Sequence, residues 1–206
     1  MRVCGSGWGG LLLALCSSGC AGTGSVYVED GHDSADYSDI EPRDPPMPVH
    51  VDCQFLRNGE PHPEVNGVLC SEVVRVLQNT RTLAPAGRGT AATLKVTVDD
   101  RADISRAFNG GLITGLTQGL IGVETRDDYH FTYSLLKVQS KPQTGLYRHA
   151  MITVAGNVPT PSSGRPLTAD DAFTVIVKQS VLAFLADVQS SPSGEAGMFV
   201  HDGSVR

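Results

Sequence analysis

The sequence has few of the patterns that usually identify an enzyme or a metalloprotein. Its six histidines include no His-x3-His pair of the kind that binds zinc on a helix. The Gly-x-Ser-x-Gly turn of serine hydrolases and the phosphate-binding Walker loop are both missing. No acidic run has the spacing of an EF-hand calcium loop. We therefore expect a protein without catalytic residues, without a cofactor and without a metal site.

Long apolar runs and an excess of positive charge are missing too. No run reaches the roughly 20 apolar residues that a membrane-spanning helix needs. The 16 Lys and Arg residues are outnumbered by 22 Asp and Glu residues, which gives a formal net charge of −6. Because the sequence contains no basic patch, we do not expect it to bind nucleic acid.

The amino terminus has the features of an export signal. Arg2 precedes an apolar run that ends at Leu15, and small residues then precede Cys20. This order resembles the bacterial lipoprotein box, in which the cysteine becomes the acylated first residue of the mature chain. The box usually has Leu where this chain has Ser17, and ordinary secretory cleavage is the alternative. We predict a signal peptide over residues 1–19 and lipidation of Cys20.

Residues 20–48 are predicted to form a tether after the lipidated cysteine. Seven acidic residues in this stretch face the single base Arg43, and four prolines lie at its end. A segment with high charge and few apolar residues cannot bury enough surface to fold, and proline stiffens a linker. Residues 190–206, which are polar and contain glycine, are predicted to be a disordered tail.

Only Cys53 and Cys70 lie beyond the targeting region among the five cysteines. In an exported protein, two such cysteines are expected to form a disulfide, and two buried free thiols are the alternative. Cys53 is on the inward side of a predicted strand, and Cys70 borders the apolar stripe of the following helix. A strand and the helix packed on it can bring the two Cα atoms within bridging distance.

The remaining pattern predicts one domain over residues 49–189. Alternation of apolar and polar residues predicts four strands, at residues 49–55, 94–98, 129–135 and 147–154. Helical spacing of apolar residues predicts a helix over residues 64–79, and a second helix follows the capping-box sequence that begins at Thr168. Two helices with single apolar stripes can cover one face of a sheet. We predict an α+β fold: a two-layer sandwich of a four-stranded sheet with two helices on one face.

An uncharged, glycine-rich stretch at residues 108–123 lies between the second and third predicted strands. Three glycines recur at four-residue intervals, each followed by a leucine: Gly111, Leu112, Gly115, Leu116, Gly119 and Leu120. This spacing permits close helix packing in membranes, yet the stretch is shorter than a bilayer span and glycine disfavours an isolated helix. We expect an insertion that contacts the membrane or self-associates; a tightly packed connection between strands is the alternative.

A family resemblance follows from four short segments. Residues 114–120, then Asp127-Asp128-Tyr129, Arg148-His149-Ala150 and residues 184–187, resemble segments of uncharacterised exported bacterial lipoproteins. The resemblance covers roughly residues 48–189 and implies no activity that could be transferred. The order of predicted elements is also similar to that of small α/β domains in envelope-assembly lipoproteins, including secretion-pore subunits, although a fold does not determine a function.

These patterns predict a non-enzymatic lipoprotein of the bacterial envelope that faces the periplasm at the outer membrane. Its partners are expected to be the membrane, through the lipid anchor, and a protein partner or further copies of itself. Two alternatives remain. One is a periplasmic hydrolase that uses His149 or the pair formed by Asp127 and Asp128. The other is a subunit of a membrane-inserted oligomer that uses residues 108–123.

Overall fold

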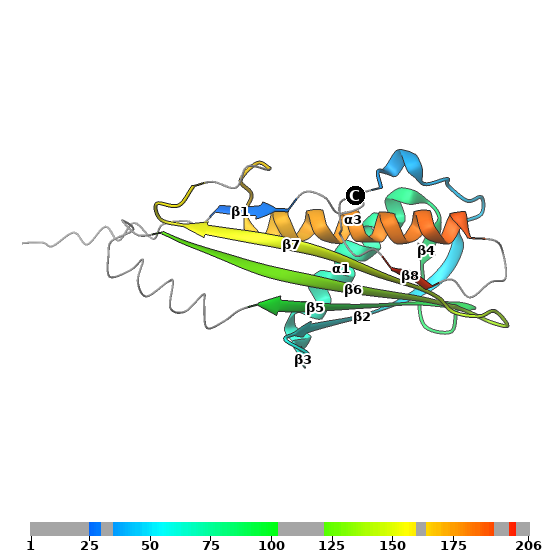
Figure 1. Ribbon diagram of the computed structural model, residues 1–206. Coiled ribbons are helices and arrows are strands. Elements are labelled where there is room, and N and C mark those ends of the chain that lie inside the picture. Colours follow the sequence, from blue (N-terminus) through cyan, green and yellow to red (C-terminus); the bar gives the residue numbers. More distant parts are fainter. Residues whose placement is uncertain (1–24, 30–34, 103–121, 160–163, 192–197, 201–206) are drawn as a thin grey trace, which may run out of the picture.

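The computed structural model describes residues 25–29, 35–102, 122–159, 164–191 and 198–200. Four long strands form the centre of the sheet: β2 (Met47–Arg57), β5 (Ala92–Ala102), β6 (Val123–Lys137) and β7 (Gln143–Ala155). They lie side by side in the order β7-β6-β5-β2 (Figure 1). β2 and β5 are parallel, and the other neighbours are antiparallel. Each long strand contains one of the four predicted strands and extends it at both ends.

The prediction of a four-stranded sheet is wrong. Four short strands enlarge it to eight in the described part of the chain: β1 (Ser25–Val28), β3 (Glu60–Pro61), β4 (Leu83–Pro85) and β8 (Met198–Val200). β1 and β8 pair with opposite ends of β7, and β3 and β4 pair with opposite ends of β2. Elements of two to four residues are too short to show a period. They occupy both outer edges, where unpaired backbone groups would otherwise remain.

Two segments expected to lie outside the domain contribute to it. The predicted tether includes β1, in which Val26 and Tyr27 are each only 5% exposed, and it also includes Ile40, which is 4% exposed. The predicted tail includes β8. Pairing with β7 satisfies the backbone of both short strands, and apolar burial holds β1 and Ile40 in place despite the acidic residues around them.

Both predicted helices are present, as α1 (Pro63–Thr80) and α3 (Ala169–Ser190). Pro63 occupies the first turn of α1, where its missing N–H needs no partner. Thr168 caps α3, because its Oγ1 accepts a hydrogen bond of 3.1 Å from the N–H of Asp171. The helices contact each other and cover the same face of the sheet (Figure 1). No described helix is both long and apolar enough to span a bilayer.

The core lies between the helices and the alternate strand residues that point toward them. Tyr133 on β6 is fully buried and stacks on Phe184 of α3, with ring centroids 5.0 Å apart. Its hydroxyl forms a hydrogen bond of 2.7 Å with Ser180, so the buried oxygen has a partner. A disulfide joins Cys53 on β2 to Cys70 on α1, with the Cα atoms 5.6 Å apart. The predicted pairing is therefore confirmed.

Candidate functional site on the open face of the sheet

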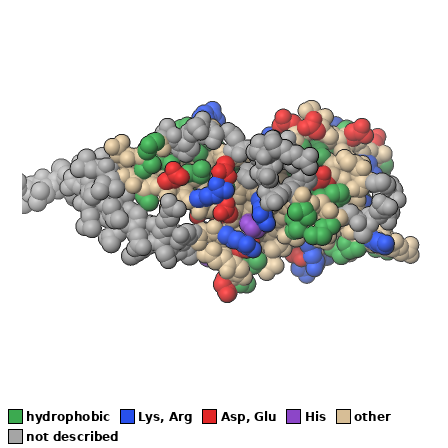
Figure 2. Space-filling view, viewed as in Figure 1, with side chains coloured by type: hydrophobic (Ala, Val, Ile, Leu, Met, Phe, Trp, Pro, Cys, Tyr) green, Lys and Arg blue, Asp and Glu red, His purple; other side chains and the backbone are tan. Residues whose placement is uncertain are grey.

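The face of the sheet turned away from the helices carries polar and charged side chains. Successive residues of a strand point to opposite faces, so the residues between the core positions of β5, β6 and β7 all lie on this side. Lys, Arg, Asp and Glu side chains gather near the middle of the surface shown in Figure 2. We call this surface the open face, because neither described helix covers it.

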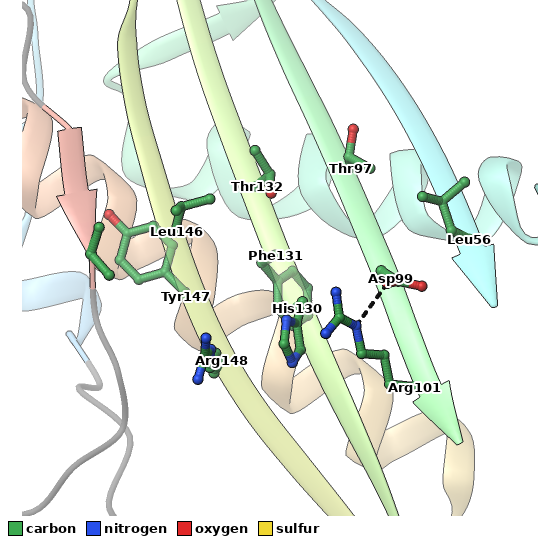
Figure 3. A pocket seen from close by; sticks show the side chains of 11 residues that line it. Leu56, Thr97, Asp99, Arg101, His130, Phe131, Thr132, Leu146, Tyr147 and Arg148 are labelled. Atoms are coloured by element: carbon green, nitrogen blue, oxygen red, sulfur yellow. Dashed lines mark hydrogen bonds and ion pairs between the residues drawn. The ribbon is translucent and has the colours of Figure 1, made fainter. Parts of the chain in front are cut away.

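Strand register brings three charged or titratable side chains into one row on the open face. Asp99 of β5 is directly opposite His130 of β6, and His130 is directly opposite Arg148 of β7. Directly opposed residues have Cβ atoms about 5 Å apart. Arg101, two residues beyond Asp99, extends back over the row, so that arginines flank the imidazole from two strands (Figure 3).

These side chains line a shallow hollow of about 340 Å³. This volume is at the lower end of the range for small-ligand sites. The other side chains on the open-face side of the hollow are apolar or carry hydroxyl groups: Leu56, Thr97, Thr132, Leu146 and Val200. The hollow therefore combines cationic groups with hydroxyl groups and some apolar surface.

Hydrogen bonds fix the single carboxylate of the row. One oxygen of Asp99 accepts a bond of 2.9 Å from the N–H of Gly59, and the other accepts a bond of 2.9 Å from Nε of Arg101. Burial opposes ionisation of this carboxyl, but the two bonds outweigh it and lower the pKa of Asp99. Asp99 is therefore ionised at neutral pH, and it orients Arg101 toward His130.

Burial and two neighbouring arginines disfavour the protonated form of His130. Burial lowers the pKa of this imidazole, and the charges of Arg101 and Arg148 lower it further. Asp99 and Asp128 act in the opposite direction, but the pKa remains below its usual value. The two arginines therefore act on the imidazole more strongly than the two carboxylates do.

An ion-pair network borders the hollow on the same face. Arg126 contacts Glu29 beyond β1 at 2.5 Å and Asp128 on its own strand at 2.9 Å. This arginine therefore lies between two carboxylates. Arg126 ties the segment after β1 to β6 and does not line the hollow.

The opposite, helix-facing side carries a second polar row at the same level of the sheet. Arg57, Asp100, Tyr129 and His149 are directly opposed across four strands. Arg57 donates to Oδ2 of Asp100 from Nε at 3.0 Å and from a terminal nitrogen at 2.9 Å. Asp100 is 1% exposed, and its Oδ1 accepts no hydrogen bond within the described residues. Burial raises the pKa of Asp100, and Arg57 only partly offsets this effect.

The second predicted strand ended at residue 98, before Asp99 and Asp100. β5 continues to Ala102, so Asp99 and Asp100 are strand residues that point to opposite faces. Asp100 is buried because its side chain points toward the helices, whereas Arg101 points to the open face.

The residues named for a hydrolase do not come together. His149 is buried on the helix-facing side and packs edge-on against Phe131, with ring centroids 5.7 Å apart. Asp127 and Asp128 are consecutive in β6, so their side chains point to opposite faces and form no carboxylate pair. No group of three or more His, Cys, Asp or Glu residues is placed to hold a metal ion in the part of the chain that the structure describes.

The other predicted site residues lie outside the described residues. They are the lipidation site Cys20 and the six membrane-contact or self-association residues: Gly111, Leu112, Gly115, Leu116, Gly119 and Leu120. Their predicted roles remain predictions.

Sequence reasoning missed the group formed by Arg101, His130 and Arg148. His130 and Arg148 had a readable phase, because each alternates with the apolar residues of its strand, whereas Arg101 lies beyond the predicted strand at residues 94–98. The three residues lie on three strands, however: the register places His130 opposite Arg148, and the bond to Asp99 brings Arg101 beside them.

Comparisons with known proteins identify no family. No protein-family model and no curated protein sequence matches the chain. Among solved structures, a PelC dodecamer from Paraburkholderia phytofirmans has 15% sequence identity and a TM-score of 0.35, covering 79% of this chain and 97% of that one. Protein XCC0632 from Xanthomonas campestris, assigned to DUF330, has 11% identity and a TM-score of 0.37, covering 72% and 90%. At TM-scores this low, neither similarity supports an argument about function.

Proposed function

We propose that this chain is a non-enzymatic lipoprotein of the bacterial envelope, anchored through acyl groups on Cys20. In this proposal its folded domain binds another molecule through the open face. The main observation that supports an envelope location is the disulfide between Cys53 and Cys70. Disulfides persist in oxidising compartments such as the periplasm and are rare in the cytosol. The export signal and the residues before Cys20 support the same location.

A binding role is supported by the distribution of polar groups. The residues considered for hydrolysis, His149 and the Asp127–Asp128 sequence, are buried or divided between two faces. The open face instead presents Arg101, His130 and Arg148 around one hollow. Charged residues on an accessible surface are suited to recognition of a charged partner.

The start of β1 also limits how far the domain can lie from its anchor. Ser25 is paired in the sheet, so only residues 21–24 connect it to Cys20. Even a fully extended chain of this length spans roughly 18 Å. An acylated Cys20 would therefore hold the β1 edge close to the membrane surface, whereas the tether predicted over residues 20–48 would have allowed a much greater distance.

The lipoprotein proposal is tested by comparing two single-cysteine variants. Cys20→Ser should remove the acyl mass from the mature protein and release it from the membrane fraction. Cys16→Ser is the matched control, because Leu15 before it is too bulky for the lipoprotein box, and it should keep both properties. Intact-mass spectrometry and membrane fractionation measure the outcome. A wild-type mature protein that begins elsewhere and carries no lipid would refute the proposal.

A further inference from the structure

The start of β1 and the segment that leads into α3 are tied together at one end of the sheet. The N–H of Val26 donates to the carbonyl of Leu167 at 3.1 Å, and the N–H of Leu167 donates to the carbonyl of Val26 at 2.9 Å. β1 also contacts α3 itself (Figure 1). These reciprocal bonds fix the surface around Leu167 beside Ser25, the first residue of β1.

A wide hollow of about 600 Å³ opens beside Ser25, and we call it the end hollow. The other described residues that line it come from the segment before α3 and from the first turn of that helix: Arg165, Pro166, Leu167, Thr168, Ala169 and Asp171. Pro166 and Ala169 are exposed. The end hollow therefore presents accessible apolar surface next to polar and charged groups.

Exposed groups of both charge signs lie at the end hollow. Arg165 is exposed, and it forms no hydrogen bond or ion pair with another described residue. Asp171 accepts a hydrogen bond of 2.8 Å from the hydroxyl of Thr168, whereas its neighbour Asp170 is exposed. Guanidinium groups bind phosphate oxygens with charge-assisted hydrogen bonds. A zwitterionic phospholipid headgroup, which contains a phosphate and an ammonium group, offers a partner to each charge sign.

The length of chain before β1 determines which end of the domain an acylated Cys20 would hold at a membrane. Only residues 21–24 separate Cys20 from Ser25, and this connection spans roughly 18 Å when fully extended. Ser25 pairs with Val154 near the end of β7, so the anchor and the end hollow belong to the same end of the sheet. β6 has 15 residues, so the opposite end lies roughly 45 Å away.

We propose that the end hollow lies against the bilayer, with Arg165 bound to phospholipid phosphates and with Pro166 and Ala169 in contact with the membrane interface. The inference rests on the proposed acylation of Cys20 and adds the orientation of the domain. The long strands then extend away from the membrane. This orientation leaves the open face accessible to the molecule that it is proposed to bind.

Fluorescence quenching by labelled lipids tests this orientation. The mature protein is purified from membranes in detergent, labelled with a maleimide fluorophore at one added cysteine, and reconstituted into vesicles of phosphatidylcholine and phosphatidylethanolamine. Part of the phosphatidylcholine carries a nitroxide quencher on its headgroup. Cys53 and Cys70 do not react, because a disulfide joins them. Ala169→Cys reports on the end hollow, Val138→Cys on the opposite end, and Lys95→Cys on the open face; all three positions are exposed.

Quenching should be strongest at Ala169, because the other two positions lie further along the strands from the anchor. Arg165→Gln should lower the ratio of quenching at Ala169 to quenching at Val138 by up to about fivefold, the effect expected from loss of one exposed ion pair. Arg88→Gln is the matched control. Arg88 is also exposed, but it precedes the start of β5, which pairs with Lys137 at the opposite end, so its loss should leave the ratio unchanged.

Three outcomes would overturn the inference: equal quenching at the three positions, stronger quenching at Lys95 or Val138 than at Ala169, or equal effects of Arg165→Gln and Arg88→Gln. Vesicle flotation and the mass of the mature protein test the lipid anchor separately. A protein that floats with the vesicles but is not quenched at Ala169 refutes the orientation alone. A protein that carries no lipid and does not float refutes both the orientation and the lipoprotein proposal.

Discussion

The disulfide between Cys53 and Cys70 provides the sharpest test of how this domain is stabilised. The bond closes a loop with a sequence separation of 17 between β2 and α1. In the chain-entropy model, a cross-link of this span destabilises the unfolded chain by about 3 kcal/mol. This is a large part of the roughly 5–15 kcal/mol by which a typical domain is stable. Loss of the bond should therefore be easy to measure.

Two perturbations separate the effect of the cross-link from that of packing. Reduction of the wild-type protein removes the bond but keeps both sulfur atoms. The double variant C53A/C70A removes the sulfurs as well, and Cys53 is only 9% exposed. We expect reduction to cost about 3 kcal/mol, and the alanine variant to cost somewhat more through the small cavity it creates.

Urea unfolding of the oxidised, reduced and double-variant proteins measures these differences. A loss of about 3 kcal/mol corresponds to a midpoint lower by about 1–3 M, given the usual slopes for small proteins. Equal midpoints for the oxidised and reduced wild-type protein would refute the assignment of stability to the cross-link. A large loss found only in C53A/C70A would show that the sulfurs act through packing alone.

Two further predictions concern single positions in the sheet. Gly145→Ala should destabilise the protein by about 1–3 kcal/mol, because the added methyl would lie 2.6 Å from the ring of Tyr147 and 2.9 Å from Phe184. Gly67→Ala in α1 is the matched control: its methyl has open space, so it should stabilise the protein by about 1 kcal/mol. Urea unfolding that ranks the two variants in the reverse order would contradict this packing. Asp127→Asn should stabilise the protein at neutral pH, since burial and then Asp100 raise the pKa of Asp127 in the folded protein. The ionised carboxylate costs folding free energy in the wild type, and this cost grows as the pH rises from the unfolded pKa through the folded pKa. The stability advantage of Asp127→Asn should therefore vanish in acid. Asp128→Asn is the control, because Asp128 lies on the opposite face and pairs with Arg126. The argument would be refuted if the stability difference between wild type and Asp127→Asn did not change with pH.

The long elements were predictable because their local pattern repeats many times. Apolar and polar residues alternate over residues 94–98 of β5 and 129–135 of β6, so the period of these central parts is unambiguous in the sequence. Thr168 marked the start of the second helix through local chemistry that does not depend on the rest of the fold. The pairing of Cys53 with Cys70 could be predicted because Cys53 lies on the inward side of its strand and Cys70 borders the apolar stripe of the following helix.

The short strands were not predictable, because their stability comes from their partners. β1 has four residues within an acidic stretch, and β8 has three residues near the carboxyl end. Neither contains enough residues to show a period. Each is a strand because β7 offers it a hydrogen-bonding edge, and no local sequence rule contains that information.

The sequence by itself determined the direction in which individual side chains point. Alternation in β6 assigned Tyr129 and Phe131 to one face and His130 to the other. Only the tertiary structure decided which residues from different strands share a surface. The register places Asp99, His130 and Arg148 in one row, while Arg57, Asp100, Tyr129 and His149 form another beneath the helices. Register is set by the packing of the buried faces over the whole sheet, so a site assembled across three strands has no signature within any one of them.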